Sequence, residues 1–179
     1  MEQEESRANT EPTAEEIAFA VSVLKKLNPG FLPKDLFIEI ARIWTTSIVE
    51  VVPVRKADGK TQVLLLKRPD DDPNWPGMLH TPGTVVRPTD SEEGIAGPIS
   101  RIYKDELNLD EWQEPVFVGP ILHKVNRGTE MSTVFYLDMS DADITEGTWY
   151  DSDNLPDNIV DTQIAFINKS LEKFSQDTN

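Results

Sequence analysis

The sequence contains no cysteine among its 179 residues. This absence excludes disulfide bonds, thiolate metal sites and cysteine nucleophiles. Only two histidines are present, and neither His80 nor His123 lies at a motif spacing from a serine, so a serine triad has no support. No apolar run approaches membrane-spanning length, and the chain begins Met-Glu-Gln-Glu-Glu, unlike the basic start of a signal peptide. We therefore expect a cytoplasmic protein that does not associate with membranes.

Positive charge is also scarce. The chain has 17 Lys and Arg residues against 32 Asp and Glu residues, which gives a formal net charge of −15. A protein that binds nucleic acid through the phosphate backbone needs patches of Lys and Arg, so we expect no such binding. An anionic small molecule remains compatible with this charge, because a bound metal ion reverses its sign locally.

The length predicts one domain with an extension. Residues 1–12 are polar and have no periodic apolar face, which predicts a disordered tail. Residues 13–45 predict a pair of helices: a capping box at Thr13 opens the first, and the second starts at Pro33. The second helix is expected to face inward with Leu36, Phe37, Ile40 and Ile43. We interpret the pair as a packing appendage, with a homodimer contact as the alternative.

The remaining residues, 46–175, are expected to form the main domain. The β-branched run 47–55 and the leucine-rich run 62–67 predict two strands around a hairpin turn at Asp58-Gly59. The leucine run also predicts burial on both faces of its strand.

A second antiparallel pair is predicted downstream, over residues 115–125 and 131–139. Gly119-Pro120 predicts a bulge or an edge position in its first strand. A final helix is expected over residues 157–174. Its expected core residues are Ile159, Ile164, Ile167 and Leu171.

Between these strand pairs lies a helix that we expect to start near Pro98, because proline suits the first helical turn. It should run to about Asn108, where an asparagine can end it in a left-handed conformation. At about 100° per residue, Glu106 falls on the same face as Ile99 and two other apolar residues of this helix. A carboxylate on a buried stripe is costly unless a cation or a set of donors satisfies it. Glu106 is therefore the first candidate for a functional residue.

The residues around Glu106 resemble the Nudix box, G-x5-E-x7-R-E-U-x-E-E-x-G-U, where U is a bulky aliphatic residue. Arg101 takes the arginine position, and Asp105 and Glu106 take the paired carboxylates. Ile102 stands where the family has a glutamate, and Asn108 replaces the last glycine.

The front half of the box is looser. If Thr84 stands for the first glycine, Asp90 fills the glutamate position, but ten residues instead of seven then separate it from Arg101. Glu93 has the right spacing to Arg101, but its loop back to Gly83 is four residues too long. We prefer Asp90, because Pro98 and the glycines before it place the extra residues ahead of the helix. Downstream, residues 147–156 resemble the W-x-x-x-(D/E)-x-L-P segment of many Nudix proteins.

The resemblance implies an α/β fold of the α+β type, the Nudix fold, in which helices sandwich a mixed sheet. It implies hydrolysis of a nucleoside diphosphate linked to another moiety, dependent on Mg²⁺ or Mn²⁺, with Asp105 and Glu106 as metal ligands. Arg101 would orient Asp90 or Glu93, and Glu130 is the candidate for a further acid from the downstream strands. The alternative is a binding or regulatory module on the same fold with weak or no hydrolysis, which the departure at Ile102 favours.

Four further residues are candidates for substrate binding. Arg68 could bind a phosphate, Trp75 could stack on a base, His80 could touch a phosphate, and backbone carbonyls at Pro82-Gly83 could complete a metal shell. Each has a simpler structural reading. Arg68 would pair with neighbouring aspartates, Trp75 would pack and His80 would cap a turn. Similarly, Asp105 would pair with Arg101, and Glu106 would meet a backbone donor. Glu130 would be a surface turn residue.

Overall fold

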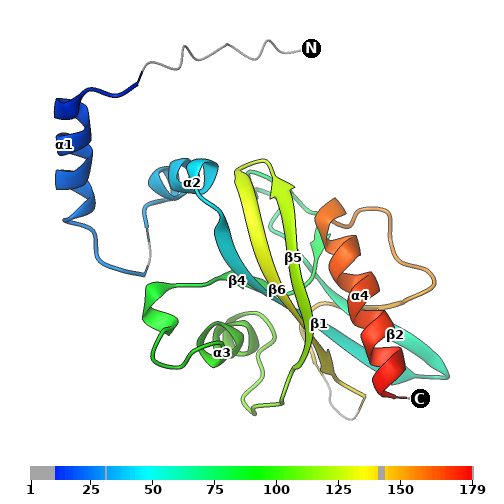
Figure 1. Ribbon diagram of the computed structural model, residues 1–179. Coiled ribbons are helices and arrows are strands. Elements are labelled where there is room, and N and C mark those ends of the chain that lie inside the picture. Colours follow the sequence, from blue (N-terminus) through cyan, green and yellow to red (C-terminus); the bar gives the residue numbers. More distant parts are fainter. Residues whose placement is uncertain (1–10, 31, 141–143, 179) are drawn as a thin grey trace, which may run out of the picture.

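The computed structural model describes residues 11–30, 32–140 and 144–178 (Figure 1). Most of the predicted disordered tail, residues 1–10, lies outside the described residues. Within the described part, no helix is both long and apolar enough to cross a membrane.

A mixed sheet of seven strands forms the centre of the molecule, in the order β3-β2-β1-β6-β5, with β4 paired to β1 and β7 paired to β2. The central pair, β1 and β6, is parallel, whereas the other pairs are antiparallel. The strands are β1 (Thr46–Ala57), β2 (Lys60–Lys67), β3 (Leu79–His80), β4 (Gly83–Val85), β5 (Val116–Val125), β6 (Gly128–Asp138) and β7 (Thr148–Asp151). The predicted α+β class with a mixed sheet is confirmed.

Local sequence signals explain both hairpins. Asp58 and Gly59 adopt positive φ angles of 52° and 75°, as the tight turn between β1 and β2 requires. Leu64 and Leu65 are fully buried on opposite faces of β2, as the leucine run predicts. The register of β5 against β6 shifts between Phe117 and Gly119, and β5 is an edge strand, so the predicted bulge and the predicted edge position are both found.

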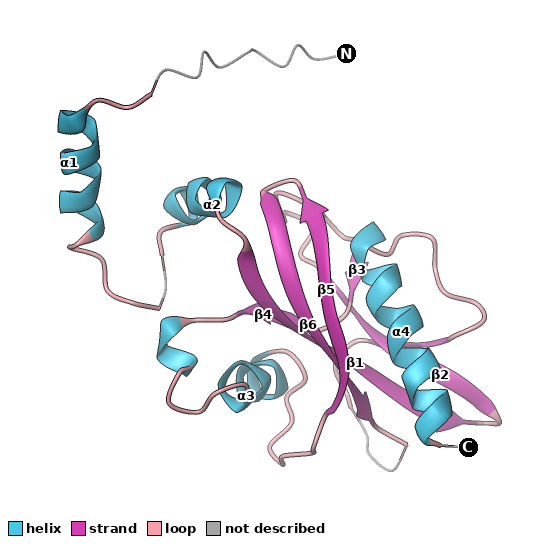
Figure 2. Ribbon diagram, viewed as in Figure 1, coloured by secondary structure: helices cyan, strands magenta, loops and turns pink. Residues whose placement is uncertain are grey.

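Helices cover both faces of the sheet (Figure 2). Helix α3 (Ala96–Asp105) packs on one face with Ile99, Ile102 and Tyr103, and helix α4 (Asp161–Asp177) packs on the other. The prediction that the last helix starts at residue 157 was wrong. Residues 158–160 instead extend along β3, because the N–H of Leu79 donates to the carbonyl of Asn158.

The predicted core of the last helix is correct only in part. Ile159 and Ile167 are buried, and Leu171 packs against the core, but Ile164 is 37% exposed. Phe166 and Phe174 of α4, which were not predicted, fill the core together with Ile167.

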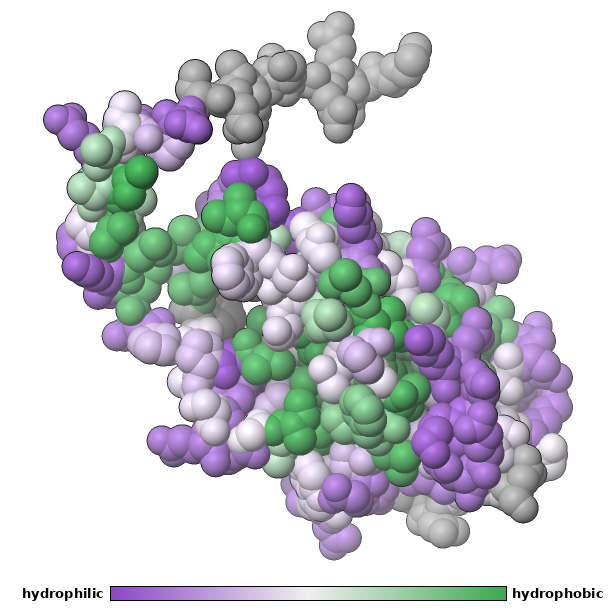
Figure 3. All heavy atoms as spheres, in the orientation of Figure 1, coloured by the Kyte–Doolittle hydropathy of each residue, from purple (hydrophilic) through white to green (hydrophobic). Residues whose placement is uncertain are grey.

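The amino-terminal extension forms α1 (Ala14–Leu24) and α2 (Lys34–Ile43). The capping box at Thr13 is present, α1 ends at Leu24, and none of its residues is buried. Figure 3 shows its apolar side chains at the surface. On α2 the prediction fails for Ile43, which is 70% exposed, while Ala41 is buried instead. The covering of α1 by a second copy of the chain stays a prediction.

Helix α2 packs tightly on the turn between β5 and β6. Gly128, the first residue of β6, has a φ of 147°, and a Cβ atom there would overlap the carbonyl oxygen of Ala41. The guanidinium of Arg127, in the same turn, lies over the ring of Phe37 at 5.5 Å from its centroid. The second helix of the extension is therefore attached to the sheet by close backbone packing.

Candidate active site

The candidate site lies beside β1, at the gap between the two strands, β4 and β2, that pair with successive parts of it. Strand β4 pairs with β1 from Ile48 to Glu50, whereas β2 pairs with it only from Val54 onward. Between these segments, the N–H of Val51 donates to the carbonyl of Pro82 at 2.9 Å. The carbonyl of Pro82, expected as a possible metal ligand, therefore accepts a hydrogen bond within the sheet. The neighbouring Gly83 begins β4 at this point.

Glu106 reaches this point from the end of α3. The helix ends at Asp105, earlier than predicted, and Glu106 is its C-cap residue instead of a member of the apolar face. Leu107 takes the core position, and Asn108 adopts a φ of 50°, the left-handed conformation that was predicted for it. The carboxylate of Glu106 is half-buried and accepts a hydrogen bond from the N–H of Gly83 at 3.3 Å.

Burial raises the pKa of Glu106 to about 7, although the N–H of Gly83 and the charge of Arg68 lower it. Among the described residues, no Lys, Arg or His forms an ion pair with Glu106. A permanent arginine partner would leave no place for a cation. The side chain is therefore available to one.

Arg101 pairs with Asp90, which lies in the short 3₁₀ helix η1 (Pro88–Asp90). The guanidinium donates to Asp90 at 2.7 Å and to the carbonyl of Val85 at 3.0 Å, and it also donates to Thr84 at 2.8 Å. Although burial alone would raise it, these donors hold the pKa of Asp90 below its usual range. Arg101 thus fastens the stretched loop to β4.

The two competing partners of Arg101 are both at the surface. Glu93 is exposed, and Asp105 is exposed and does not pair with Arg101 among the described residues. The reading in which Asp105 pairs with Arg101 one turn back is therefore wrong. Exposure also leaves Asp105 at the rim of the site.

Asp90→Asn is expected to lower the free energy of unfolding by about 2 kcal/mol, because it leaves the guanidinium of Arg101, only 20% exposed, without its carboxylate. That loss corresponds to a fall in melting temperature of about 4–8 °C. Thermal unfolding followed by circular dichroism measures it. The matched variant Glu93→Gln should have the melting temperature of the wild type. An equal fall in melting temperature in both variants would contradict the pairing of Arg101 with Asp90.

Glu50 is a functional candidate that was not predicted. It lies in β1 opposite Gly83 and is only 6% exposed. Its carboxylate accepts a hydrogen bond from the hydroxyl of Thr81 at 3.0 Å, and the side-chain oxygen of Gln163 in α4 accepts one from the backbone N–H of the same threonine. Burial raises the pKa of Glu50 to about 8, and the nearby charge of Glu106 raises it further. A lone carboxylate within the apolar run 48–54 was the signal in the sequence that could have identified it.

Glu130 is buried in β6 rather than placed in a surface turn, so the simpler structural reading was wrong for it. Its carboxylate accepts hydrogen bonds from Arg127 at 2.6–2.7 Å. It lies 4.0 Å from the ring nitrogen of His123, which bonds to Ser132. Glu130 and Glu50 lie close enough for the charge of Glu130 to add to the raised pKa of Glu50.

The remaining candidates line the loop before β3. Arg68 donates to Asp72 at 2.9 Å, so the expected salt bridge to a neighbouring aspartate is found. The ring of Trp75 has the guanidinium of Arg68 at 5.3 Å and that of Arg127 at 5.8 Å from its centroid. Two cations therefore flank one aromatic ring beside the site. This arrangement suits an anionic ligand with a flat base.

His80 forms part of β3, and its Nδ1 bonds to the carbonyl of Thr81 at 2.8 Å. Burial and the nearby charge of Arg68 lower the pKa of His80 to about 4. The ring is therefore neutral near pH 7, which makes it a weaker partner for a phosphate than either arginine.

The lowered pKa of His80 predicts a loss of stability in acid. The unfolded chain binds a proton at this histidine near pH 6.5 and the folded chain near pH 4, so stability falls as the pH drops through that window. We expect about 3 kcal/mol less stability at pH 4 from this residue. Urea unfolding of wild type and His80→Gln between pH 7 and pH 4 measures the difference. Parallel curves for the two proteins would contradict it.

A divalent cation fits the donor set around Gly83. Among the described residues, no three His, Asp or Glu side chains converge as a complete metal cage. Mg²⁺, however, is commonly held by one or two carboxylates together with waters and substrate phosphates. Glu50 and Glu106 supply two such carboxylates, and Gly83 lacks the Cβ that would otherwise fill the space beside Glu50.

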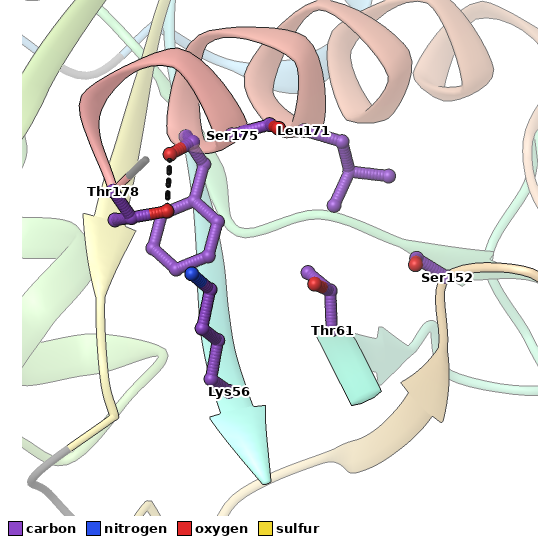
Figure 4. A pocket seen from close by; sticks show the side chains of 7 residues that line it. Lys56, Thr61, Ser152, Leu171, Ser175 and Thr178 are labelled. Carbon is purple, nitrogen blue, oxygen red and sulfur yellow. Dashed lines mark hydrogen bonds between the residues drawn. The ribbon is translucent and has the colours of Figure 1, made fainter. Parts of the chain in front are cut away.

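A separate pocket of about 340 Å³ lies under the carboxyl end of α4 (Figure 4). Its lining residues are Lys56, Thr61, Ser152, Leu171, Phe174, Ser175 and Thr178. It includes no carboxylate side chain and lies at the opposite end of α4 from Gln163, so it is distinct from the candidate site.

Comparison with known proteins places the fold. No protein-family model matches the sequence, and no curated protein matches it by sequence. The NUDIX domain of Shewanella oneidensis NrtR in complex with ADP ribose has a TM-score of 0.59, with 14% identity, over 86% of this chain and 97% of that chain. The MutT protein from Methanosarcina mazei Go1 has a TM-score of 0.54, with 17% identity, over 75% and 96%.

The Ap4A hydrolase of C. elegans is also similar, with a TM-score of 0.52 and 17% identity, over 76% of this chain and all of that chain. Likeness at this level of identity shows the fold. The chain has the Nudix fold, as the sequence predicted.

Proposed function

We propose that this chain uses its Nudix fold as a divalent-cation-dependent hydrolase of a nucleoside diphosphate linked to another moiety. The observation that carries the proposal is the position of Glu106. Its carboxylate is directed at the N–H of Gly83, has no arginine partner among the described residues, and lies near a second buried carboxylate. Such a site can hold a cation that it shares with a diphosphate.

The chain's own residues have separable roles in this reaction. A bound Mg²⁺ or Mn²⁺ would neutralise the diphosphate and polarise the attacking water. Glu106 would hold the ion, and the exposed Asp105 would join it at the rim. Arg101 and Asp90 would keep the loop ahead of α3 fixed, so that Gly83 stays in place. Glu130 would act as a further acid beside the site.

The substrate is proposed from the groups around Trp75. Its ring can stack on a base, and the guanidinium groups of Arg68 and Arg127 can face the phosphates. The similar NrtR domain was crystallised with ADP ribose, which is a ligand of this chemical class. The cytoplasmic location, together with the homodimer contact given as the alternative role of the helical extension, belongs to the same proposal. Cell fractionation and sedimentation test these two points.

The second candidate function is a nucleotide-binding module without turnover. Ile102, which stands at a glutamate position of the box, is fully buried in the core and cannot reach a cation. Asp105, the other carboxylate of the pair, is exposed. A shell with fewer carboxylates binds the metal ion more weakly. Weak metal binding favours a protein that binds a nucleotide without hydrolysing it.

A panel assay separates the two functions. Nucleotide sugars, ADP ribose and dinucleoside polyphosphates are incubated with the protein and Mg²⁺ or Mn²⁺, and the products are resolved by chromatography. Metal-dependent cleavage of any member supports the hydrolase. A rise in melting temperature with nucleotide but no cleavage across the panel would instead support the binding module.

A further inference from the structure

The site lacks one carboxylate that the Nudix box would lead one to expect. Ile102 occupies that position, and its side chain packs with Ile99 and Leu107 against the sheet. It is fully buried, so no rearrangement of a surface side chain can replace it. Any additional ligand must come from another element.

Glu50 lies beside the same glycine as Glu106. A Cβ atom on Gly83 would lie 2.5 Å from the carboxyl carbon of Glu50 and 2.8 Å from one of its oxygens. Glu106 accepts the N–H of that glycine from the end of α3. Strand β1 and helix α3 therefore each bring a carboxylate to Gly83, and only a residue without a side chain leaves both in place.

The surroundings of Glu50 hold it in position without pairing it with a cationic side chain. The hydroxyl of Thr81 donates to it, Gln163 bonds to the same threonine, and both of these side chains are uncharged. No described Lys, Arg or His forms an ion pair with it, and the charges nearest to it are those of Glu106 and Glu130. A buried carboxylate beside two others is costly unless a cation is bound.

We propose that Glu50 supplies to the divalent cation the carboxylate that Ile102 does not, so that Glu50 and Glu106 hold the ion together beside Gly83. Thr81 and Gln163 act as positioning residues that orient the Glu50 carboxylate toward it. This assignment rests on the proposed cation-dependent function, and it names which side chain compensates for the altered box.

Metal binding tests the assignment without reference to turnover. Mn²⁺ binding is measured by electron paramagnetic resonance on wild type, Glu50→Gln and the control Glu172→Gln, which alters an exposed residue of α4. We expect the Mn²⁺ dissociation constant of Glu50→Gln to rise at least about tenfold. The control should bind as the wild type does. The metal-free melting temperature of Glu50→Gln should stay close to that of the wild type, because the amide has nearly the same size and can still accept the hydroxyl of Thr81.

The assignment would be overturned by an unchanged Mn²⁺ affinity in Glu50→Gln or by an absence of Mn²⁺ binding in the wild type. It would also be overturned if metal-free Glu50→Gln had a melting temperature well below that of the metal-free wild type. The variant Glu50→Asp provides the second measurement if the amide does not fold, because it keeps the charge and shortens its reach. An Mn²⁺ affinity of Glu50→Asp that is weaker than that of the wild type but still measurable supports a ligand role for Glu50. An Mn²⁺ affinity equal to that of the wild type overturns it.

Failure of this assignment and failure of the proposed function give different results. If the wild type binds Mn²⁺ through Glu50 but cleaves no substrate, the hydrolase proposal falls and the ligand assignment stands. If the wild type cleaves a substrate and Glu50→Gln binds Mn²⁺ equally well, the assignment falls and the hydrolase stands.

Discussion

Glu106→Gln is expected to reduce the rate of metal-dependent cleavage by at least about 10³-fold. A carboxylate that holds the ion contributes several kcal/mol to the stabilisation of charge in the transition state, and each 1.36 kcal/mol is a factor of ten in rate. The amide keeps the size of the side chain and can still accept the N–H of Gly83. The melting temperature without metal should therefore stay the same or rise.

The measurement is kcat on the best substrate of the panel at saturating Mn²⁺, with thermal unfolding of each protein. Glu111→Gln is the matched control, because Glu111 is an exposed glutamate shortly after α3. Equal rates in wild type and Glu106→Gln would end the case for Glu106 as a ligand. A lower melting temperature with the same loss of rate would show damage to the fold instead.

Gly128→Ala is expected to lower the free energy of unfolding by about 3 kcal/mol, because its new Cβ would overlap the backbone of α2. The atoms it meets are the carbonyl of Ala41, whose carbon would lie 2.8 Å away, and the Cα of Arg42 at 3.3 Å. Backbone atoms cannot turn aside as a flexible side chain can. The melting temperature should fall by about 6–12 °C.

Gly119→Ala is the control for the backbone angle. Gly119 has a φ of 150° against 147° for Gly128, but a Cβ atom there meets nothing within 4 Å. The difference between the two variants therefore isolates the clash with α2 from the strain of a positive φ. Hydrogen exchange of the amides of α2 (residues 34–43) should accelerate in Gly128→Ala alone. Similar losses of stability in both variants would show that backbone strain, and not the packing of α2, is the cause.

Local signals predicted most of the fold. The capping box at Thr13, the turn at Asp58-Gly59 and the left-handed Asn108 are each decided by a few adjacent residues, and all three are present. The exposure of Ile43 and Ile164 was not predictable in the same way. Apolar residues at helical spacing identify the face of a helix that packs on the core. Tertiary contacts determine which residues at the edge of that face are covered.

The site was predictable to the extent that it lies on one element. Glu106 could be identified by its place among apolar residues of one helix, and the structure directs it inward, although as a cap residue. Glu50 has the same signature in a strand, but its significance depends on the pairing of β1 with β4, which brings Gly83 opposite to it. Pairing between distant segments is not contained in the spacing of nearby residues.

The box also shows how a motif can keep its contacts when its spacing changes. Ten residues separate Asp90 from Arg101, and the extra length is accommodated in the turns between η1 and α3. The ion pair between Asp90 and Arg101 nevertheless forms at 2.7 Å. Spacing alone would have selected Glu93, whereas attention to where a helix can start selected the residue that pairs.

The parallel pairing of β1 with β6 has a consequence for synthesis of the chain. Thr46 is matched with Glu130 and Val54 with Asp138, so the two central strands are separated by on the order of 80 residues. On the ribosome, β1 emerges long before β6, so the edge of β1 that pairs with β6 stays unpaired until β6 has been synthesised. Until β6 arrives, that apolar edge is the part of the nascent chain most exposed to chaperones and to self-association.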